Sequence, residues 1–220
     1  MTNMEEKEHI EETTASRPTA LEVLSRILSA AFNPFLIPLY AFILLFQFTY
    51  MTIMPPAYKL FLLGMVGTFT MLSPLLFIGI YKWMNKWSMK ELGERKRRFV
   101  PYLLTIMSYA TCLLILYRMR FPYYFTGIIT AYLLSMIICA LANFRWRLSI
   151  HLTGCGLLIG SLLAYSLLLR FNPVWWLCGF ILLAGIQGTA RISFHQHTLF
   201  EVIAAFVAGM FCGIIGILFI

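Results

Sequence analysis

Long runs without a single charged residue dominate this sequence and constrain its fold more than any other feature. About 20 apolar residues in a helix cross the hydrocarbon core of a bilayer. The runs are continuous and do not alternate with polar residues, which favours helices over strands. We therefore expect an all-α fold, a polytopic transmembrane helical bundle with six to seven spans. The candidate spans are Ile27–Tyr58 without its ends, Leu60–Tyr81, Phe99–Tyr117, Phe121–Phe144, Leu148–Leu169, Phe171–Ala190 and Val202–Ile220.

The third and seventh runs are the shortest, so one of these two is the expected partial or re-entrant segment. Proline lacks an amide hydrogen, and it is tolerated at helix starts and at kinks. The prolines at positions 34, 38, 74, 101, 122 and 173 are expected to mark such places.

Composition supports a bilayer as the partner of this chain. Hydrophobic residues make up 60% and charged residues 12%, whereas about 25% of residues are charged in a soluble domain. The net charge of +8 lies in short loops and forms no long basic tract, which favours orientation in a membrane over nucleic-acid binding. Residues 1–27 are polar and read as a mobile tail. Residues 28–220 read as one transmembrane domain.

Counting the spans places the loops on two faces. The 82–98 loop, the 145–147 loop and the 191–201 segment are separated by two spans each, so they share one face with the N-terminus. Of the 17 basic residues, 13 lie on this face. The positive-inside rule makes it the cytoplasmic face, and we expect a multi-pass protein of a bacterial inner membrane.

Three clusters of ionisable residues meet on the shared face, where burial in apolar segments makes each a functional hypothesis. The first is the basic run from Lys90 to Pro101. If it enters a helix, Arg95 and Arg98 lie three residues apart on one helix face, and two guanidiniums so placed can clamp a phosphate. The alternative interpretation is a topology anchor.

The second cluster is Ser149 and His151, at the start of the fifth span. Backbone N–H groups at a helix start favour anions, and the serine adds a hydroxyl donor. The alternative is that the histidine only forms a hydrogen bond between helices.

The third cluster holds Arg191, His195, His197 and Glu201. On a helix, His197 and Glu201 would be neighbours four residues apart. A carboxylate that accepts the imidazole N–H fixes its tautomer and raises the basicity of the other ring nitrogen, as a nitrogen nucleophile needs. A purely structural pair is the alternative. A metal site is disfavoured because His195 and His197 would point about 200° apart on a helix, so we expect no metal and no cofactor.

These clusters resemble the motifs of the type-2 phosphatidic acid phosphatase family, the lipid phosphate phosphatases related to vanadium haloperoxidases. Its third motif (SR, five residues, H, three residues, D) matches Arg191, His197 and Glu201, with Ala190 replacing serine and glutamate replacing aspartate. Its PSGH motif matches Ser149 and His151 in register. Its first motif (K, six residues, RP) matches Lys90 and Arg97, with Arg98 in place of proline. The register of Arg95, Arg98 and Pro101 fits equally well. The motif region is 90–201.

The resemblance implies a membrane phosphatase that acts on a lipid or isoprenoid phosphate. His197 would attack phosphorus and form a phosphohistidine, Glu201 would orient it, and His151 would protonate the leaving group and then activate water. Arg191, Ser149, Arg95, Arg98 and Lys90 would bind the phosphate. The resemblance also favours a site that faces away from the cytoplasm, against the positive-inside rule.

Three other functions remain open at this point. A phosphotransferase would use the same phosphoenzyme with a lipid or sugar acceptor. A membrane scaffold or lipid-binding protein would keep the fold without the activity. A transporter is less favoured, because the sequence has no obvious inverted repeat or charged midplane residue. The specific substrate and the oligomeric state do not follow from the sequence.

Overall fold

The computed structural model describes residues 33–48, 50–86, 99–146, 148–194 and 196–219. These residues form helices and contain no strand, which confirms the predicted all-α fold. The tail predicted over residues 1–27 lies outside them. The elements are α3 (Ile37–Phe48), the 3-10 turn η1 (Tyr50–Ile53), α4 (Pro56–Gly67), the π-helical η2 (Thr68–Leu72), α5 (Ser73–Asn85), α7 (Phe99–Arg118), α8 (Tyr123–Ala142), α9 (Ile150–Leu169), α10 (Val174–Ser193) and α11 (Leu199–Leu218).

Within the described residues, six helical segments are long and apolar enough to cross a membrane. The segments α4, η2 and α5 run on as one helix of 30 residues, and each of the other five has 20. The short helix is α3, with 12 residues. The expectation that the third or seventh run is partial was therefore wrong, because Phe99–Arg118 and Leu199–Leu218 are both full-length helices.

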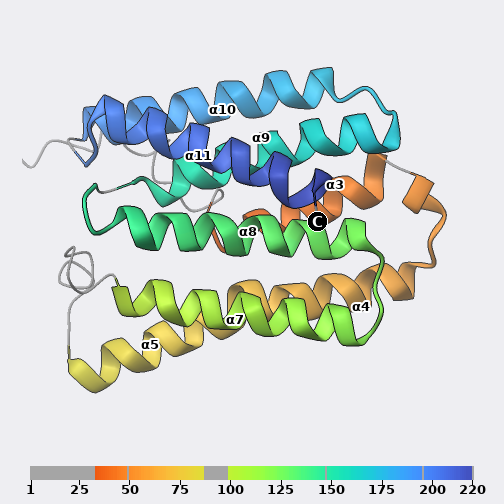
Figure 1. The fold of residues 1–220 in the computed structure, drawn as a ribbon, viewed down its shortest axis with the longest axis horizontal. Coiled ribbons are helices and arrows are strands. Elements are labelled where there is room, and N and C mark those ends of the chain that lie inside the picture. Colours follow the sequence, from red (N-terminus) through yellow and green to blue (C-terminus); the bar gives the residue numbers. More distant parts are fainter. Residues whose placement is uncertain (1–32, 49, 87–98, 147, 195, 220) are drawn as a thin grey trace, which may run out of the picture.

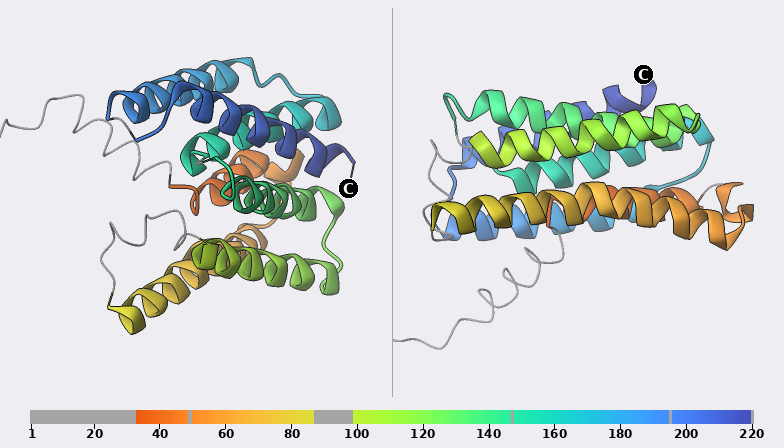
Figure 2. Two further views of the ribbon diagram at one scale, coloured as in Figure 1. Left: turned by 60° about the vertical axis from the view of Figure 1, so that its left-hand side comes forward. Right: turned by 90° about the horizontal axis from the view of Figure 1, so that it is seen from below.

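The helices run along one common direction, and α9 lies at the centre of the bundle (Figures 1 and 2). Most side chains of α9 are buried, because α3, α8, α10 and α11 all pack against it. The outer faces of the bundle carry exposed apolar side chains such as Leu72, Leu114 and Leu182. Water would not tolerate so much exposed apolar surface, so the fold is compatible with a multi-pass integral membrane protein.

A π-helical turn interrupts the longest span, and hydroxyl groups of α7 cover it. Pro74 has no amide hydrogen to donate to the preceding turn, and the π-turn shifts the neighbouring backbone bonds. The Ser108 hydroxyl donates to the Phe69 carbonyl at 2.5 Å and lies 3.0 Å from the Ser73 hydroxyl. The Tyr109 hydroxyl donates to the Thr70 carbonyl at 3.5 Å. A proline kink is thus satisfied from a neighbouring helix, as membrane helices require.

We expect Ser108→Ala to lower the free energy of unfolding by about 1 kcal/mol, because it leaves the Phe69 carbonyl without its donor inside the bundle. Thermal unfolding in detergent measures the change. Thr111→Val is the matched control, since the Thr111 hydroxyl is exposed and bonds within its own helix. Equal loss in the two variants would contradict this account of the π-turn.

Glycines bring α9 and α11 into backbone contact. A Cβ added at Gly156 would lie 2.0 Å from the Phe206 carbonyl oxygen, and one added at Gly209 would lie 2.0 Å from the Thr153 carbonyl oxygen. Small residues spaced four apart allow membrane helices to approach this closely. The helix that carries His151 is therefore locked against the helix that begins beside His197. The glycines at this interface are Gly156, Gly160, Gly209 and Gly213.

One end of the bundle collects the helix ends that the sequence placed on a single face. The end of α5, the start of α7, the α8–α9 connection and the α10–α11 connection all lie there, on the left of Figure 1. This arrangement agrees with the crossing count from the sequence. It brings the starts of α9 and α11 to the same level of the bundle.

Candidate active site

The segment between α10 and α11 is a short, hydrogen-bonded connection. The Phe194 amide donates to the Ala190 carbonyl at 3.1 Å, and the Gln196 amide donates to the Arg191 carbonyl at 3.1 Å. Helix α11 then begins behind Thr198, whose hydroxyl accepts from the Glu201 amide at 3.3 Å. The Glu201 carboxylate in turn accepts from the Thr198 amide at 3.1 Å. This reciprocal capping box fixes the start of the helix.

The predicted pair of His197 and Glu201 is present. Nδ1 of His197 lies 3.3 Å from Oε2 of Glu201, and the two side chains are 11% and 19% exposed. We expected the two residues to share a helix face. They do not, because Thr198 is the N-cap of α11 and His197 precedes the helix. A carboxylate can only accept, so the neutral imidazole donates from Nδ1 and keeps its lone pair on Nε2.

The geometry accounts for a glutamate at position 201. Glu201 stands at the third helical position, and its carboxylate folds back over the helix start to reach both the Thr198 amide and the His197 ring. One methylene more than in aspartate gives the side chain this reach. The sequence signal for it, Thr198 followed three residues later by Glu201, is a capping-box pattern.

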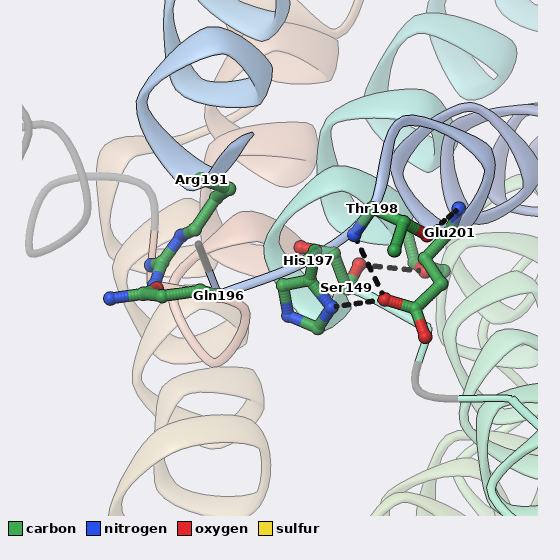
Figure 3. Close-up of polar contacts among 7 residues, drawn as sticks. Ser149, Arg191, Gln196, His197, Thr198 and Glu201 are labelled. Carbon is green, nitrogen blue, oxygen red and sulfur yellow. Dashed lines mark hydrogen bonds and ion pairs between the residues drawn. The ribbon is translucent and has the colours of Figure 1, made fainter. Parts of the chain in front are cut away.

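Arg191 stands in the last turn of α10 and is half-buried. Its Nη1 donates to Oε1 of Gln196. In Figure 3 the Arg191 and Gln196 side chains lie together on one side of His197, and Glu201 lies on the other. The Arg191 guanidinium, the His197 imidazole and the Glu201 carboxylate therefore lie in their sequence order around the connection between α10 and α11 (Figure 3).

Ser149 is the N-cap residue of α9, and it makes no side-chain cap. Its hydroxyl is buried and has no hydrogen-bond partner among the described residues. Buried polar groups normally have partners, so this hydroxyl is available to a ligand. The first amides of α9 also point out of the helix start, where they favour an anion.

His151 is held by a glutamine that the sequence analysis missed. Nε2 of Gln187 lies 3.3 Å from Nδ1 of His151, and Oε1 of Gln187 accepts from the Cys155 thiol at 3.2 Å. Gln187 is only 2% exposed. The sequence did carry a signal for Gln187. It is an uncharged polar residue in an apolar run, and it stands four residues before Arg191, hence on the same helix face.

The end of the bundle that carries the site is cationic. Glu201 is the only carboxylate side chain among the described residues. Lys82 and Lys86 stand at the end of α5, Arg145 follows α8, and Arg191 ends α10. The opposite end carries as many described cations, namely Lys59, Arg118, Arg120 and Arg170. The positive charge therefore attracts anions without singling out this end.

Five residues named from the sequence lie outside the described residues. They are Lys90, Arg95, Arg97 and Arg98 of the basic run, and His195. The predicted phosphate clamp therefore stays a prediction, and the disfavoured metal alternative, which needs His195, is not tested. The structure does bring together the ends of α9, α10 and α11, which carry Ser149, His151, Arg191, His197 and Glu201 (Figures 1 and 3).

A small apolar hollow lies apart from this site, between α3 and α9. Its nearest lining residue on α9, Leu158, is seven residues beyond His151, or about 10 Å along the helix. Its walls suit hydrocarbon and offer no charge for a phosphate. The lining residues are Ala41, Leu44, Leu45, Leu158, Ser161, Leu162, Tyr165 and Phe171.

No family model, curated protein or solved structure matches this chain. The functional interpretation therefore depends on the residues at the bundle end and their contacts.

Proposed function

We propose that this protein is a membrane phosphatase that hydrolyses a lipid or isoprenoid phosphate through a phosphohistidine. The contact between Nδ1 of His197 and the Glu201 carboxylate carries this proposal. It directs the imidazole proton to the carboxylate and the lone pair to Nε2, which is the form that attacks phosphorus. The spacing of Arg191, His197 and Glu201, which resembles the type-2 phosphatidic acid phosphatase motif, supports the same chemistry.

The reaction has two displacements at phosphorus. Nε2 of His197 forms a bond to phosphorus while the bond to the lipid oxygen breaks, and His151 gives a proton to the departing alkoxide. His151 then takes a proton from water as the water oxygen attacks phosphorus and the phosphorus–nitrogen bond breaks. The products are the lipid alcohol and inorganic phosphate. One imidazole working near neutral pH can act first as acid and then as base.

Charge stabilisation would come from the protein's own cations and donors. Phosphoryl transfer depends mainly on positioning and on neutralising the oxygens of the transferring group. Arg191, the Ser149 hydroxyl and the first amides of α9 stand at the same bundle end as His197. This end is the level of the membrane at which a lipid headgroup lies, so the substrate would reach the site from the bilayer.

We expect the purified full-length protein to release inorganic phosphate from a panel of lipid and isoprenoid phosphates. The rate should be unchanged when EDTA is present, because the proposed chemistry uses histidines and arginines. Free phosphate is measured directly, and the lipid products are separated in parallel. Phosphate that appears only on an added lipid or sugar alcohol would indicate a phosphotransferase. Neither release nor transfer from any member of the panel would contradict the proposal and favour a scaffold or lipid-binding protein.

A further inference from the structure

Gln196 bonds to Arg191 twice, once through its backbone and once through its side chain. The Gln196 amide donates to the Arg191 carbonyl at 3.1 Å. Oε1 of Gln196 accepts from Nη1 of Arg191. The first bond folds the connection back onto the end of α10, and the second ties the guanidinium to the folded chain. The proposed reaction has so far given Gln196 no role.

A neutral acceptor suits a cation that has to bind a phosphate. The amide oxygen of Gln196 carries no formal charge, so this contact orients the guanidinium without cancelling its positive charge. A guanidinium has more N–H groups than one acceptor can use, and its planar fork matches the oxygens of a phosphate. A carboxylate at position 196 could hold the same N–H group, but it would neutralise the charge that attracts the phosphate.

Gln196 also links the guanidinium to the proposed nucleophile, because it directly precedes His197 in the chain. In Figure 3 the Arg191 and Gln196 side chains lie together on one side of the His197 ring. Glu201 lies on the other side, with its carboxylate 3.3 Å from Nδ1 of His197. The same short connection thus carries a held cation and a held imidazole. An arginine that is already fixed loses less conformational entropy when an anion binds.

We propose that Gln196 is a positioning residue that holds Arg191 for phosphate binding while leaving its charge uncancelled; this inference rests on the proposed function. A purely structural role would require only an acceptor at position 196 that keeps the connection folded. The two roles give different outcomes for Gln196→Glu, since glutamate keeps the shape and the acceptor oxygen but adds a negative charge. A structural role makes glutamate better than alanine, and the positioning role makes it worse.

Calorimetric titration of the full-length protein in detergent with inorganic phosphate tests the inference without any use of activity. We expect Gln196→Ala to raise the Kd for phosphate about threefold, because the freed guanidinium has to be ordered when phosphate binds. We expect Gln196→Glu to raise it about tenfold, because phosphate must displace a carboxylate from the guanidinium. In Arg191→Ala protein, Gln196→Ala should have no further effect, since the group that it holds is gone.

Ser193→Glu is the matched control, because it adds the same charge at the exposed last residue of α10. It should change the Kd by less than about twofold. Thermal unfolding shows that each variant is folded.

Three results would overturn the inference. They are wild-type affinity in Gln196→Glu, equal losses in Gln196→Glu and Ser193→Glu, and a full effect of Gln196→Ala without Arg191. A wild-type protein that binds no phosphate would overturn it together with the proposed function. The expected order of affinities in a protein that hydrolyses no lipid phosphate would count against the proposed function alone.

Discussion

Replacing His197 by alanine is expected to lower the rate of phosphate release by at least about 10³-fold, because it removes the nitrogen that forms the covalent intermediate. Substrate binding should change little, since the cations and the Ser149 hydroxyl remain. Single-turnover kinetics with a soluble short-chain lipid phosphate measures the chemical step by itself. Glu201→Gln is expected to lower the same rate by a smaller factor, because an amide can still reach the ring but holds no negative charge beside it.

Two comparisons make this prediction specific. Thr198→Ser keeps the hydroxyl that caps α11, so it should retain activity even though it alters the residue next to His197. A loss of stability in His197→Ala would appear in thermal unfolding, which is measured on the same preparation. Turnover that survives in folded His197→Ala protein would show that the nucleophile is another group.

Adding a methyl group at Gly156 or Gly209 is expected to cause the largest loss of stability of any single substitution described for this bundle. Each new Cβ would lie 2.0 Å from a backbone carbonyl oxygen of the facing helix. A side-chain tip can rotate away, but a helix backbone cannot, so α9 and α11 must separate. We expect Gly156→Ala and Gly209→Ala to lower the free energy of unfolding by about 3 kcal/mol each. Thermal unfolding in detergent measures the loss.

Gly179→Ala and Gly185→Ala are the matched controls, because a Cβ at either position on α10 meets nothing within 4 Å. They should leave stability unchanged or raise it slightly, since alanine favours a helix more than glycine does. Equal stability of the Gly156 and Gly209 variants and these controls would contradict the close packing of α9 on α11.

The fold was largely predictable because the bilayer demands long uncharged runs. The ends of the helices were less so, because a charged residue ends an uncharged run without ending the helix. Helix α10 continues through Arg191 to Ser193, and α11 begins at Leu199, ahead of Glu201. Polar caps and hydrogen bonds extend these helices beyond their apolar segments. The shortness of α3 also escaped prediction, since an uncharged run does not show where the helix within it stops.

The part of the candidate site that depends on residues close together in the sequence was predictable, because a short separation along the chain limits the distance between their side chains. His197 and Glu201 are four residues apart and do form a pair, although the pair spans a helix cap. Gln187 was missed because its partner His151 lies 36 residues away. A contact of this kind depends on how two helices are rotated against each other. The Gly156 and Gly209 pattern that fixes the packing of α9 on α11 was visible in the sequence, but its meaning appears only when the two helices are seen together.

Trapping the phosphoenzyme tests the central claim most directly. The protein is mixed with a lipid phosphate labelled at phosphorus, quenched within one turnover in base, and digested for mass spectrometry. The account predicts label on the peptide that contains His197, stable in base and lost in acid as expected of a phosphorus–nitrogen bond, and no label in His197→Ala. Label on a serine, threonine or carboxylate, or turnover in which no labelled protein forms, would contradict it.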